Sequence, residues 1–503
     1  MRRLSVDLKP RLVFADQLGP EFIDDYEQPR VIIQSRANFF RPIHYAKAQL
    51  MLSAIRHAAA ESVVPTRLIV ADDFAKGVAE IKGEFEVINP TSYRARALIS
   101  GNSNATVLPS RGFVTSEAEF NSWVSARKPK RLVMEDFYRH ARISHGVLMR
   151  GSEPVGGKWN FDHENREPPP KGMATLGLSK PWQATPDLID EEVDRDLGLW
   201  QKQHGFNYLG AHSDRIFPVT PVEAGQAFEN FLDNRLVKFG PYEDAMMASD
   251  WLMSHSALSM ALNLGLISPT FCVERAEAQL SQGAPLASVE GFIRQIMGWR
   301  DFIWHVYWYF GPDYVRESNA LGAKTPLPTW FQELTPEQLD ARCLSQTLSD
   351  IHERAWVHHI PRLMILANWA MQRGYQPQEM VAWFRDMFVD GFEWVMAANV
   401  IGMGLYADGG KMSTKPYAAG GAYINRMSDY CSGCKFDPKV RVGEKACPFT
   451  AGYWSFLAKN EQSLRGNHRM SQPLAGLRRL KDLSEVIATS ARFDQGNLDE
   501  VSA

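Results

Sequence analysis

Short apolar runs alternate with longer amphipathic stretches over the first quarter of the chain. The runs read RLVFAD, RVIIQS, TRLIVAD, FEVIN and ATVLPS, and stretches such as HYAKAQLMLSAIRHAAAE separate them. Runs of this length are typical of buried strands, whereas apolar residues spaced three and four apart are typical of helices. Strands that alternate with helices form a parallel sheet covered by helices. We therefore predict a Rossmann-like α/β domain over residues 1–135, although no GxGxxG motif of the NAD-binding kind follows the first run.

The pattern changes twice further along the chain. Over residues 136–221, segments such as SEPVGGKWNFDHENREPPPKG are rich in proline, glycine and polar residues, which predicts a connector that wraps over the surface. From residue 222 to residue 503 the apolar positions recur at helical spacing. The fold class is therefore an α/β N-terminal domain followed by an all-α C-terminal domain.

One segment of the helical part, LASVEGFIRQIMGWRDFIWHVYWYFG, predicts a single long and mostly buried helix with Ser288 as its N-cap. Arg294, Gln295 and Arg300 lie among its apolar positions. An unpaired buried charge is costly, so these side chains need polar partners. A bound cofactor and an internal ion pair would both supply them.

Composition narrows the classes of function. The chain has 503 residues, 45% hydrophobic and 22% charged, which suits two or three domains with ordinary cores. We find no apolar stretch of about eighteen residues and no signal sequence, so we expect a cytoplasmic protein without a membrane span. No coiled-coil pattern is evident, and a monomer is expected. Because the net charge is −3, any nucleic-acid binding must come from a local basic face.

Cysteine supplies the strongest chemical signal. The segment SDYCSGCKFDPKVRVGEKACPF holds three of the five cysteines, with Cys431 and Cys434 in a CxxC pair and Cys447 followed by proline, as in ferredoxin cluster runs. Either a structural zinc or a 4Fe-4S cluster needs a fourth thiolate, from Cys272 or Cys343. The thiol count alone favours zinc, and the spacing does not choose the fourth ligand.

Three segments together carry a family resemblance: GGKWNFDHENR, EGFIRQIMGWRDF and NVIGMGLYADGGKMSTKPYAAGGAYINRMSDYCSGC. They resemble the iron-sulfur bacterial cryptochromes and photolyases, and the resemblance covers nearly the whole chain. It implies a helical domain that holds FAD in a bent pose beside an iron-sulfur region. The activity implied is light-driven repair of (6-4) photoproducts in UV-damaged DNA. The alternative within the same family is a blue-light photoreceptor with little or no repair.

The resemblance also implies the ligand sets. It assigns a 4Fe-4S cluster to Cys343, Cys431, Cys434 and Cys447, and leaves Cys272 as a buried free thiol. The small hydroxyl side chains around His255 suit a seat for the FAD pyrophosphate. The residues expected to contact FAD are His255, Ser256, Ser259, Glu290, Arg294, Gln295, Trp299, Arg300, Asp390 and Asn399.

Repair in similar enzymes begins when excited, fully reduced FAD passes an electron to the lesion, and a proton must then arrive. Histidine suits proton donation because its pKa lies near working pH. By resemblance His359 is the donor, with His358 beside it and Arg362 three residues further along. The family places Asp162, Arg166 and Tyr417 beside the lesion pocket, and its electron-transfer chain passes through Trp383 and Trp330.

Three positions depart from the family pattern. Phe384 stands where an oxidisable tyrosine is expected, and Met396 stands where a glutamate near the flavin is expected. These two changes leave the photoreceptor alternative open. Asn38 replaces an acidic contact to the antenna pigment 6,7-dimethyl-8-ribityllumazine, so that pigment is an open expectation as well.

Overall fold

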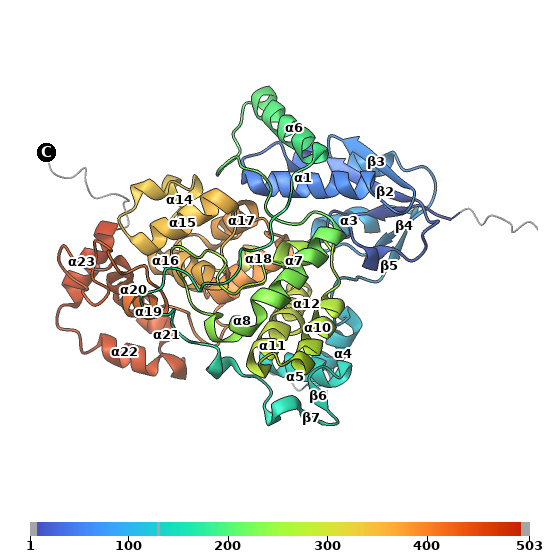
Figure 1. The fold of residues 1–503 in the computed structure, drawn as a ribbon. Coiled ribbons are helices and arrows are strands. Elements are labelled where there is room, and N and C mark those ends of the chain that lie inside the picture. Colours follow the sequence, from blue (N-terminus) through green and yellow to red (C-terminus); the bar gives the residue numbers. More distant parts are fainter. Residues whose placement is uncertain (1–7, 128–130, 494–503) are drawn as a thin grey trace, which may run out of the picture.

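The five apolar runs form one parallel sheet, as predicted. The computed structural model describes residues 8–127 and 131–493, and places the sheet at one end of the molecule (Figure 1). The strands run in the order β3-β2-β1-β4-β5 and every neighbouring pair is parallel. Their bounds are β1 (Arg11–Val13), β2 (Arg30–Ser35), β3 (Thr66–Ala71), β4 (Phe85–Ile88) and β5 (Ala105–Leu108).

Helices cover both faces of this sheet. Successive side chains of a strand point to opposite faces, so the buried neighbours Ile32 and Ile33 enter different cores. Ile32 joins the main core with the side chains of α1, and Ile33 packs against Gly77 of α2, where an added Cβ would lie 2.5 Å from the isoleucine. The helices around the sheet and in the predicted connector are α1 (Tyr45–Ala60), α2 (Phe74–Ala79), α3 (Tyr93–Ser100), α4 (Glu117–Ser125), α5 (Met134–His145) and α6 (Leu188–His204).

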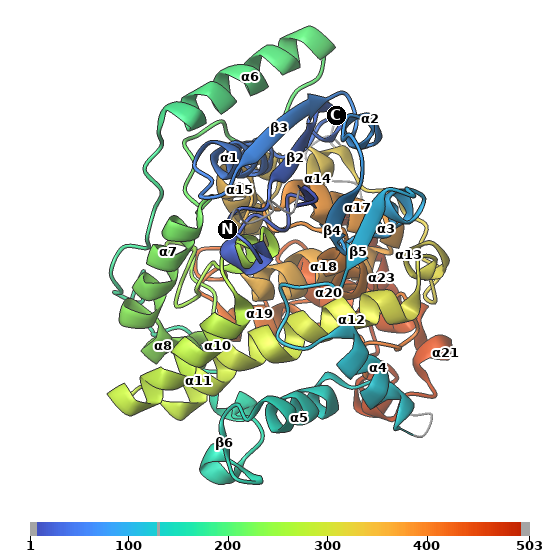
Figure 2. The same cartoon turned by 90° about the vertical axis from the view of Figure 1, so that its right-hand side faces the viewer.

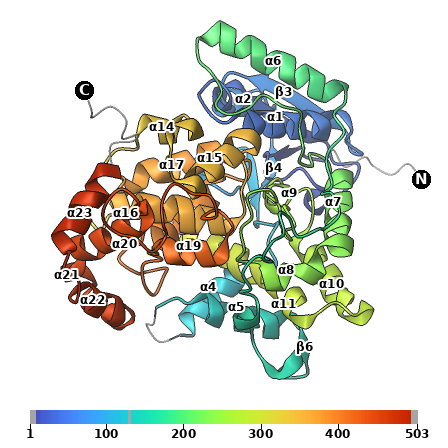
Figure 3. The same cartoon turned by 60° about the vertical axis from the view of Figure 1, so that its left-hand side comes forward.

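The predicted domain limits stay predictions. Helix α5 crosses the limit at residue 135, and α6 lies inside the predicted connector, beside α1 on the outer side of the molecule (Figure 3). Between these helices the described connector contains only the short β6 (Met149–Arg150) and β7 (Glu153–Pro154) and two turns of 3-10 helix.

The described chain beyond the connector is helical. None of its helices combines the length and the apolar character needed to cross a membrane. The helices are α7 (Pro221–Asn234), α8 (Leu236–Tyr242), α9 (Ser259–Asn263), α10 (Pro269–Ala278), α11 (Leu286–Ile293), α12 (Asp301–Phe310), α13 (Tyr314–Glu317), α14 (Thr329–Gln332), α15 (Arg342–Arg354), α16 (Asn368–Arg373), α17 (Pro377–Met387), α18 (Glu393–Ala398), α19 (Gly421–Met427), α20 (Pro448–Lys459), α21 (Glu461–Leu464), α22 (Ser471–Leu477) and α23 (Leu483–Arg492).

The long helix is present, but it differs from the prediction in two ways. Helices α11 and α12 form one rod in Figure 2, joined by a wider π-helical turn over Arg294–Arg300. The predicted N-cap, Ser288, is wrong: the extended Pro285 precedes the first turn, and the Ser288 hydroxyl instead accepts from the Gly240 N–H and donates to the Val237 carbonyl. π-Helical turns occur often at functional sites.

The start of α1 joins the sheet to the helical part. The Lys47 ammonium is buried and donates to the carbonyl of Gly391 at 2.6 Å and to that of Arg385. Arg41 makes two hydrogen bonds to Asp386, at 2.8 and 2.9 Å. His44 caps α1 by accepting the Ala46 N–H, and its Nε2 donates to the Ile351 carbonyl at 2.8 Å. These contacts fix α15, the end of α17 and the loop before α18 against the first domain.

His44 makes stability sensitive to acid. Burial lowers its pKa to about 4, below the unfolded value near 6.5, so its contribution is complete above pH 6.5 and is lost as pH falls toward 4. Urea unfolding at pH 7 and pH 5 should show the wild type losing about 2 kcal/mol more than His44→Asn, in which asparagine still caps the helix. The partly exposed His145→Asn serves as the control and should keep the wild-type difference. Equal pH dependence in wild type and His44→Asn would contradict this account.

Candidate functional site

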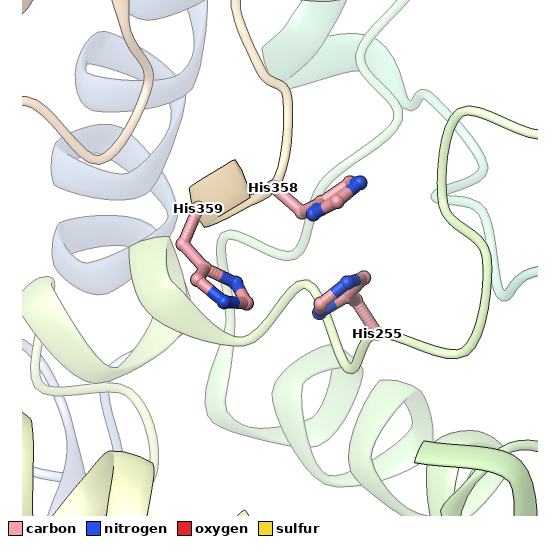
Figure 4. A group of neighbouring side chains, drawn as sticks. All are labelled: His255, His358 and His359. Atoms are coloured by element: carbon pink, nitrogen blue, oxygen red, sulfur yellow. The ribbon is translucent and has the colours of Figure 1, made fainter. Parts of the chain in front are cut away.

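Three histidines from two segments meet at one point (Figure 4). The His255 and His358 rings are buried and stacked, with centroids 4.2 Å apart, and the His359 ring stands edge-on to His255 at 5.5 Å. The side chain of His359 is 46% exposed, and its Nε2 lies 3.4 Å from Oδ1 of Asp244. One histidine therefore faces outward beside a carboxylate, while two lie behind it in the interior.

The two inner histidines are neutral at pH 7. Burial holds the pKa of His255 and of His358 well below the ordinary value, and the charge of Arg362 lowers that of His358 further. Nε2 of His255 has no hydrogen-bond partner among the described residues. A buried polar nitrogen without a partner is costly unless a ligand satisfies it. His255 therefore fits its predicted place in a ligand site.

A buried ion cluster lies next to the histidines, on the long helix. Nη2 of Arg294 is 3.3 Å from Asp162, and its Nε is 3.5 Å from Glu290. Gln295 donates to Glu243, whose pKa burial raises to about 7 against the opposing charge of Arg294. The internal ion pair considered for Arg294 is thus present, and it ties the long helix to the connector.

The other predicted FAD contacts on the long helix point elsewhere. Arg300 donates to the carbonyls of Gly112, at 2.7 Å, and Leu262, at 3.1 Å. Trp299 is partly buried against the main core. The long helix therefore meets the histidine site at Glu290, Arg294 and Gln295 rather than along its whole length.

The predicted lesion-pocket residues come together from distant parts of the chain. Asp162 and Arg166 form an ion pair in the connector. Burial raises the pKa of Tyr417, and the charges of Asp162 and Arg166 act on the same phenol. Glu243 in turn lies within the field of His359 and Asp162. These mutual charge effects indicate that the predicted lesion-pocket residues lie near one another: Asp162, Arg166, Tyr417 and His359.

Arg362 turns away from His359, although sequence spacing grouped them. Its guanidinium donates to both oxygens of Asp390, at 2.9 and 3.0 Å. The Ser259 hydroxyl donates to the same carboxylate at 2.6 Å, where α9 begins. Two predicted FAD residues, Ser259 and Asp390, are thus joined directly.

Two further predicted FAD residues have less distinctive surroundings. Ser256 is half-buried in the loop that follows His255. Asn399 donates to the carbonyl of Val395 at 2.9 Å, one turn earlier in its own helix.

Both predicted electron-transfer tryptophans are buried and touch the same phenylalanine. The ring of Phe331 lies 4.6 Å from Trp383 and 5.5 Å from Trp330. The sequence reasoning missed Trp369, which lies 6.2 Å from Trp330; only its place in an apolar run could have drawn attention to it. Phe384 stacks on Phe388 at 5.2 Å, and Met396 is buried in α18.

Four cysteines line one cavity, and Cys272 is not among them. Cys343, Cys431, Cys434 and Cys447 surround the cavity, between the start of α15 and the start of α20. Burial raises the pKa of Cys343, and the charges of the other three thiols raise it further. No three of the described cysteines bring their sulfur atoms within 4.8 Å of one another. Tetrahedral zinc would need sulfur atoms about 3.8 Å apart, so the cavity suits a larger group.

Comparisons with known proteins identify the family of the chain. Residues 11–205 match the family described as deoxyribodipyrimidine photo-lyase-related protein. A (6-4) photolyase of Agrobacterium fabrum is 38% identical over 500 residues, which cover 94% of this chain and 96% of that protein.

Solved structures show the same fold at low identity. A bacterial class III photolyase from Agrobacterium tumefaciens superposes with a TM-score of 0.55 at 16% identity, over 83% of each chain. A cryptochrome of Synechocystis sp. PCC6803 gives 0.52 at 11% identity, over 79% of this chain and 82% of its own. From the near end-to-end match to the Agrobacterium fabrum protein, the chain belongs to the (6-4) photolyase family.

Proposed function

We propose that the protein is a light-dependent lyase that reverses (6-4) pyrimidine photoproducts in UV-damaged DNA. The observation that carries the proposal is His359, a half-exposed histidine beside Asp244, in the same neighbourhood as Asp162, Arg166 and Tyr417. The 38% identical relative bears the name (6-4) photolyase, which favours repair over the photoreceptor alternative. Met396 and Phe384 are then substitutions that repair tolerates.

His359 supplies the proton. Nε2 of His359 lies 3.4 Å from the Asp244 carboxylate on a half-exposed ring, so a bound lesion could come within hydrogen-bond reach of this imidazole. His358 and His255 stay neutral behind it and add no competing positive charge. Asp162 and Arg166 form an ion pair beside the proposed lesion pocket, and Tyr417 offers that pocket an aromatic face and a hydroxyl. When bound and reduced, FAD would supply the electron after absorbing light.

Basic side chains gather where a DNA strand would enter. Burial raises the pKa of Tyr417, and the positive charges of Arg166 and Arg469 oppose that rise. Arg426 opposes the same rise at the neighbouring Tyr423. Phosphate contacts by such groups would give a local positive face on a protein whose net charge is −3.

FAD would be held around the Ser259–Asp390 contact. The unpartnered Nε2 of His255 and the half-buried Ser256 lie on the same loop as Ser259. Trp383 and Trp330, in contact through Phe331, would pass electrons toward this place. Asn38 is exposed, and the lumazine antenna stays a prediction, as do the monomeric state and the cytoplasmic location.

The four-cysteine cavity would hold a 4Fe-4S cluster. No three of the described cysteine sulfurs lie within 4.8 Å of one another, which favours a group larger than one zinc ion. The cysteines come from α15, the start of α20 and the loop between α19 and α20. A cluster bound there would join these segments, so its binding energy would contribute directly to the stability of the helical part.

Replacing the proton donor should stop the reaction without removing the flavin. His359→Ala should repair a short DNA carrying one (6-4) lesion at least about 100-fold more slowly under blue light, with the flavin fully reduced. Flavin content measured by absorption should stay at the wild-type level. His352→Ala removes a partly exposed histidine from α15 and should repair normally, and a dark reaction checks light dependence. Near-normal turnover by His359→Ala would refute the assignment.

Removing one cluster ligand should lower the stability of the protein as well as its activity. Cys434→Ala should lose iron and melt at a lower temperature than wild type, because the cluster joins three segments. Cys272→Ala is the matched control: this thiol is buried in α10, away from the cavity, and the variant should keep its iron. Iron content and thermal unfolding measure both effects. A Cys434→Ala protein that lacks iron and is as stable as wild type would exclude the role proposed.

A further inference from the structure

A second group of possible metal ligands lies far from the histidine site, where α6 packs on α1. His57 stands near the end of α1, Glu61 follows that helix, and Asp187 caps the start of α6. One ligand atom from each lies within 4.8 Å of the others. The His57 side chain is only 3% exposed, whereas both carboxylates reach solvent.

The hydrogen bonds around His57 determine which of its nitrogens carries a proton. The Ser53 hydroxyl gives its one hydrogen to Asp190, so its oxygen can only accept from Nδ1 of His57, 3.2 Å away. The Ser53 carbonyl, 2.9 Å from Nδ1, is also an acceptor. Nδ1 must therefore carry the hydrogen. In the neutral ring, Nε2 then presents a lone pair to Oδ2 of Asp187 at 3.1 Å.

A lone pair and two carboxylates that face one another repel unless a proton or a metal ion lies between them. A histidine whose Nδ1 donates to a carbonyl is in the orientation that metal-binding histidines use. Asp187 Oδ1 is already taken by the N–H groups of Ile189 and Asp190, which leaves Oδ2 directed at the group. Among the described residues, no cationic side chain forms an ion pair with Glu61.

The neighbouring cations are already paired with other carboxylates. Arg215 is buried and shared between Asp190 and Glu223, and Arg56 of α1 pairs with Asp196 of α6. Among the described residues, neither guanidinium forms an ion pair with Asp187 or Glu61.

We propose that His57, Asp187 and Glu61 bind a divalent transition-metal ion of the zinc type. One imidazole and two carboxylates are a donor set that zinc accepts, with water completing the coordination. The ion fastens α6, and with it the connector, to α1. The site is independent of the proposed repair reaction.

The histidine trio at the candidate functional site suits a metal less well. Ring lone pairs lie in the plane of each imidazole, and His255 and His358 are stacked with planes only 20° apart. Their lone pairs therefore run side by side rather than toward one ion. The group at α1 and α6 has no such stacking.

Zinc uptake by the iron-replete full-length protein tests the proposal. After equilibrium dialysis against micromolar ZnCl₂, elemental analysis should find about one more zinc per chain in wild type than in Asp187→Asn. The asparagine oxygen still caps α6, so the variant removes the charge and keeps the helix start. Zinc should also raise the melting temperature of wild type by about 2 °C or more and leave that of Asp187→Asn unchanged.

His57→Gln should lose the same zinc, with at least about tenfold weaker binding. His145→Gln is the matched control, because His145 also lies beside a carboxylate, at 3.0 Å from Glu119, and it should bind zinc like wild type. Equal zinc uptake and equal melting shifts in wild type, Asp187→Asn and His57→Gln would overturn the proposal. His57 would then be a protonated partner of Asp187 and nothing more.

Discussion

The buried carboxylate of Asp390 joins the segments on which the site depends. Arg362 binds it with two hydrogen bonds, Ser259 with a third, and Asn263 donates to its backbone carbonyl at 3.2 Å. Arg362 follows His359 by three residues, and Ser259 follows His255 by four. One ion pair therefore sets how closely the two histidine segments approach. Breaking a buried pair by removing one partner typically costs about 3–5 kcal/mol, so this spacing is strongly held.

Differences in burial divide the titratable groups of the site by role. His255 and His358 lie in the interior and stay neutral, while His359 is half exposed beside Asp244. Burial raises the pKa of Glu243 to about 7 although Arg294 lies nearby. Burial keeps a proton off the two inner histidines, whereas the outer ring is open to solvent and to a bound ligand.

The sequence was most informative where local pattern decides structure. The inner strands β1, β2 and β4 were predictable because they are largely buried and read as continuous apolar runs. The edge strands β3 and β5 are partly exposed, and their β-branched residues identified them. Ser288 was a wrong N-cap because Pro285 starts the turn earlier. The π-helical turn was missed because the apolar residues before and after it were assigned one α-helical period, whereas a π-helical turn bonds residues five apart. Sequence spacing did not distinguish Cys343 from Cys272 as the fourth thiolate ligand. Only the fold brings Cys343 to the other three thiols.

The candidate site was predictable through family resemblance more than through pattern. His359, Asp162 and Tyr417 lie in three separate segments, and nothing in their spacing shows that they meet. The same holds for Arg362, which looked like a neighbour of His359 and instead binds Asp390. His57 was missed because a single histidine in a helical stretch does not reveal that Asp187 and Glu61 lie beside it.

The connector reaches the site although it has little secondary structure of its own, so side-chain bonds must hold it. The buried Arg142 donates to the Trp159 carbonyl at 2.7 Å, and the Phe161 N–H donates to Glu290 at 3.0 Å. Asn165 donates to the Ala287 carbonyl at 3.1 Å. These bonds come immediately before and after Asp162, and each reaches a helix whose own position is set by core packing. A buried polar group left without its partner costs about 1–3 kcal/mol, so the connector cannot move away without exposing or stranding several of them. The position of Asp162 and Arg166 is therefore a property of the helical core, transmitted through buried hydrogen bonds rather than through local secondary structure.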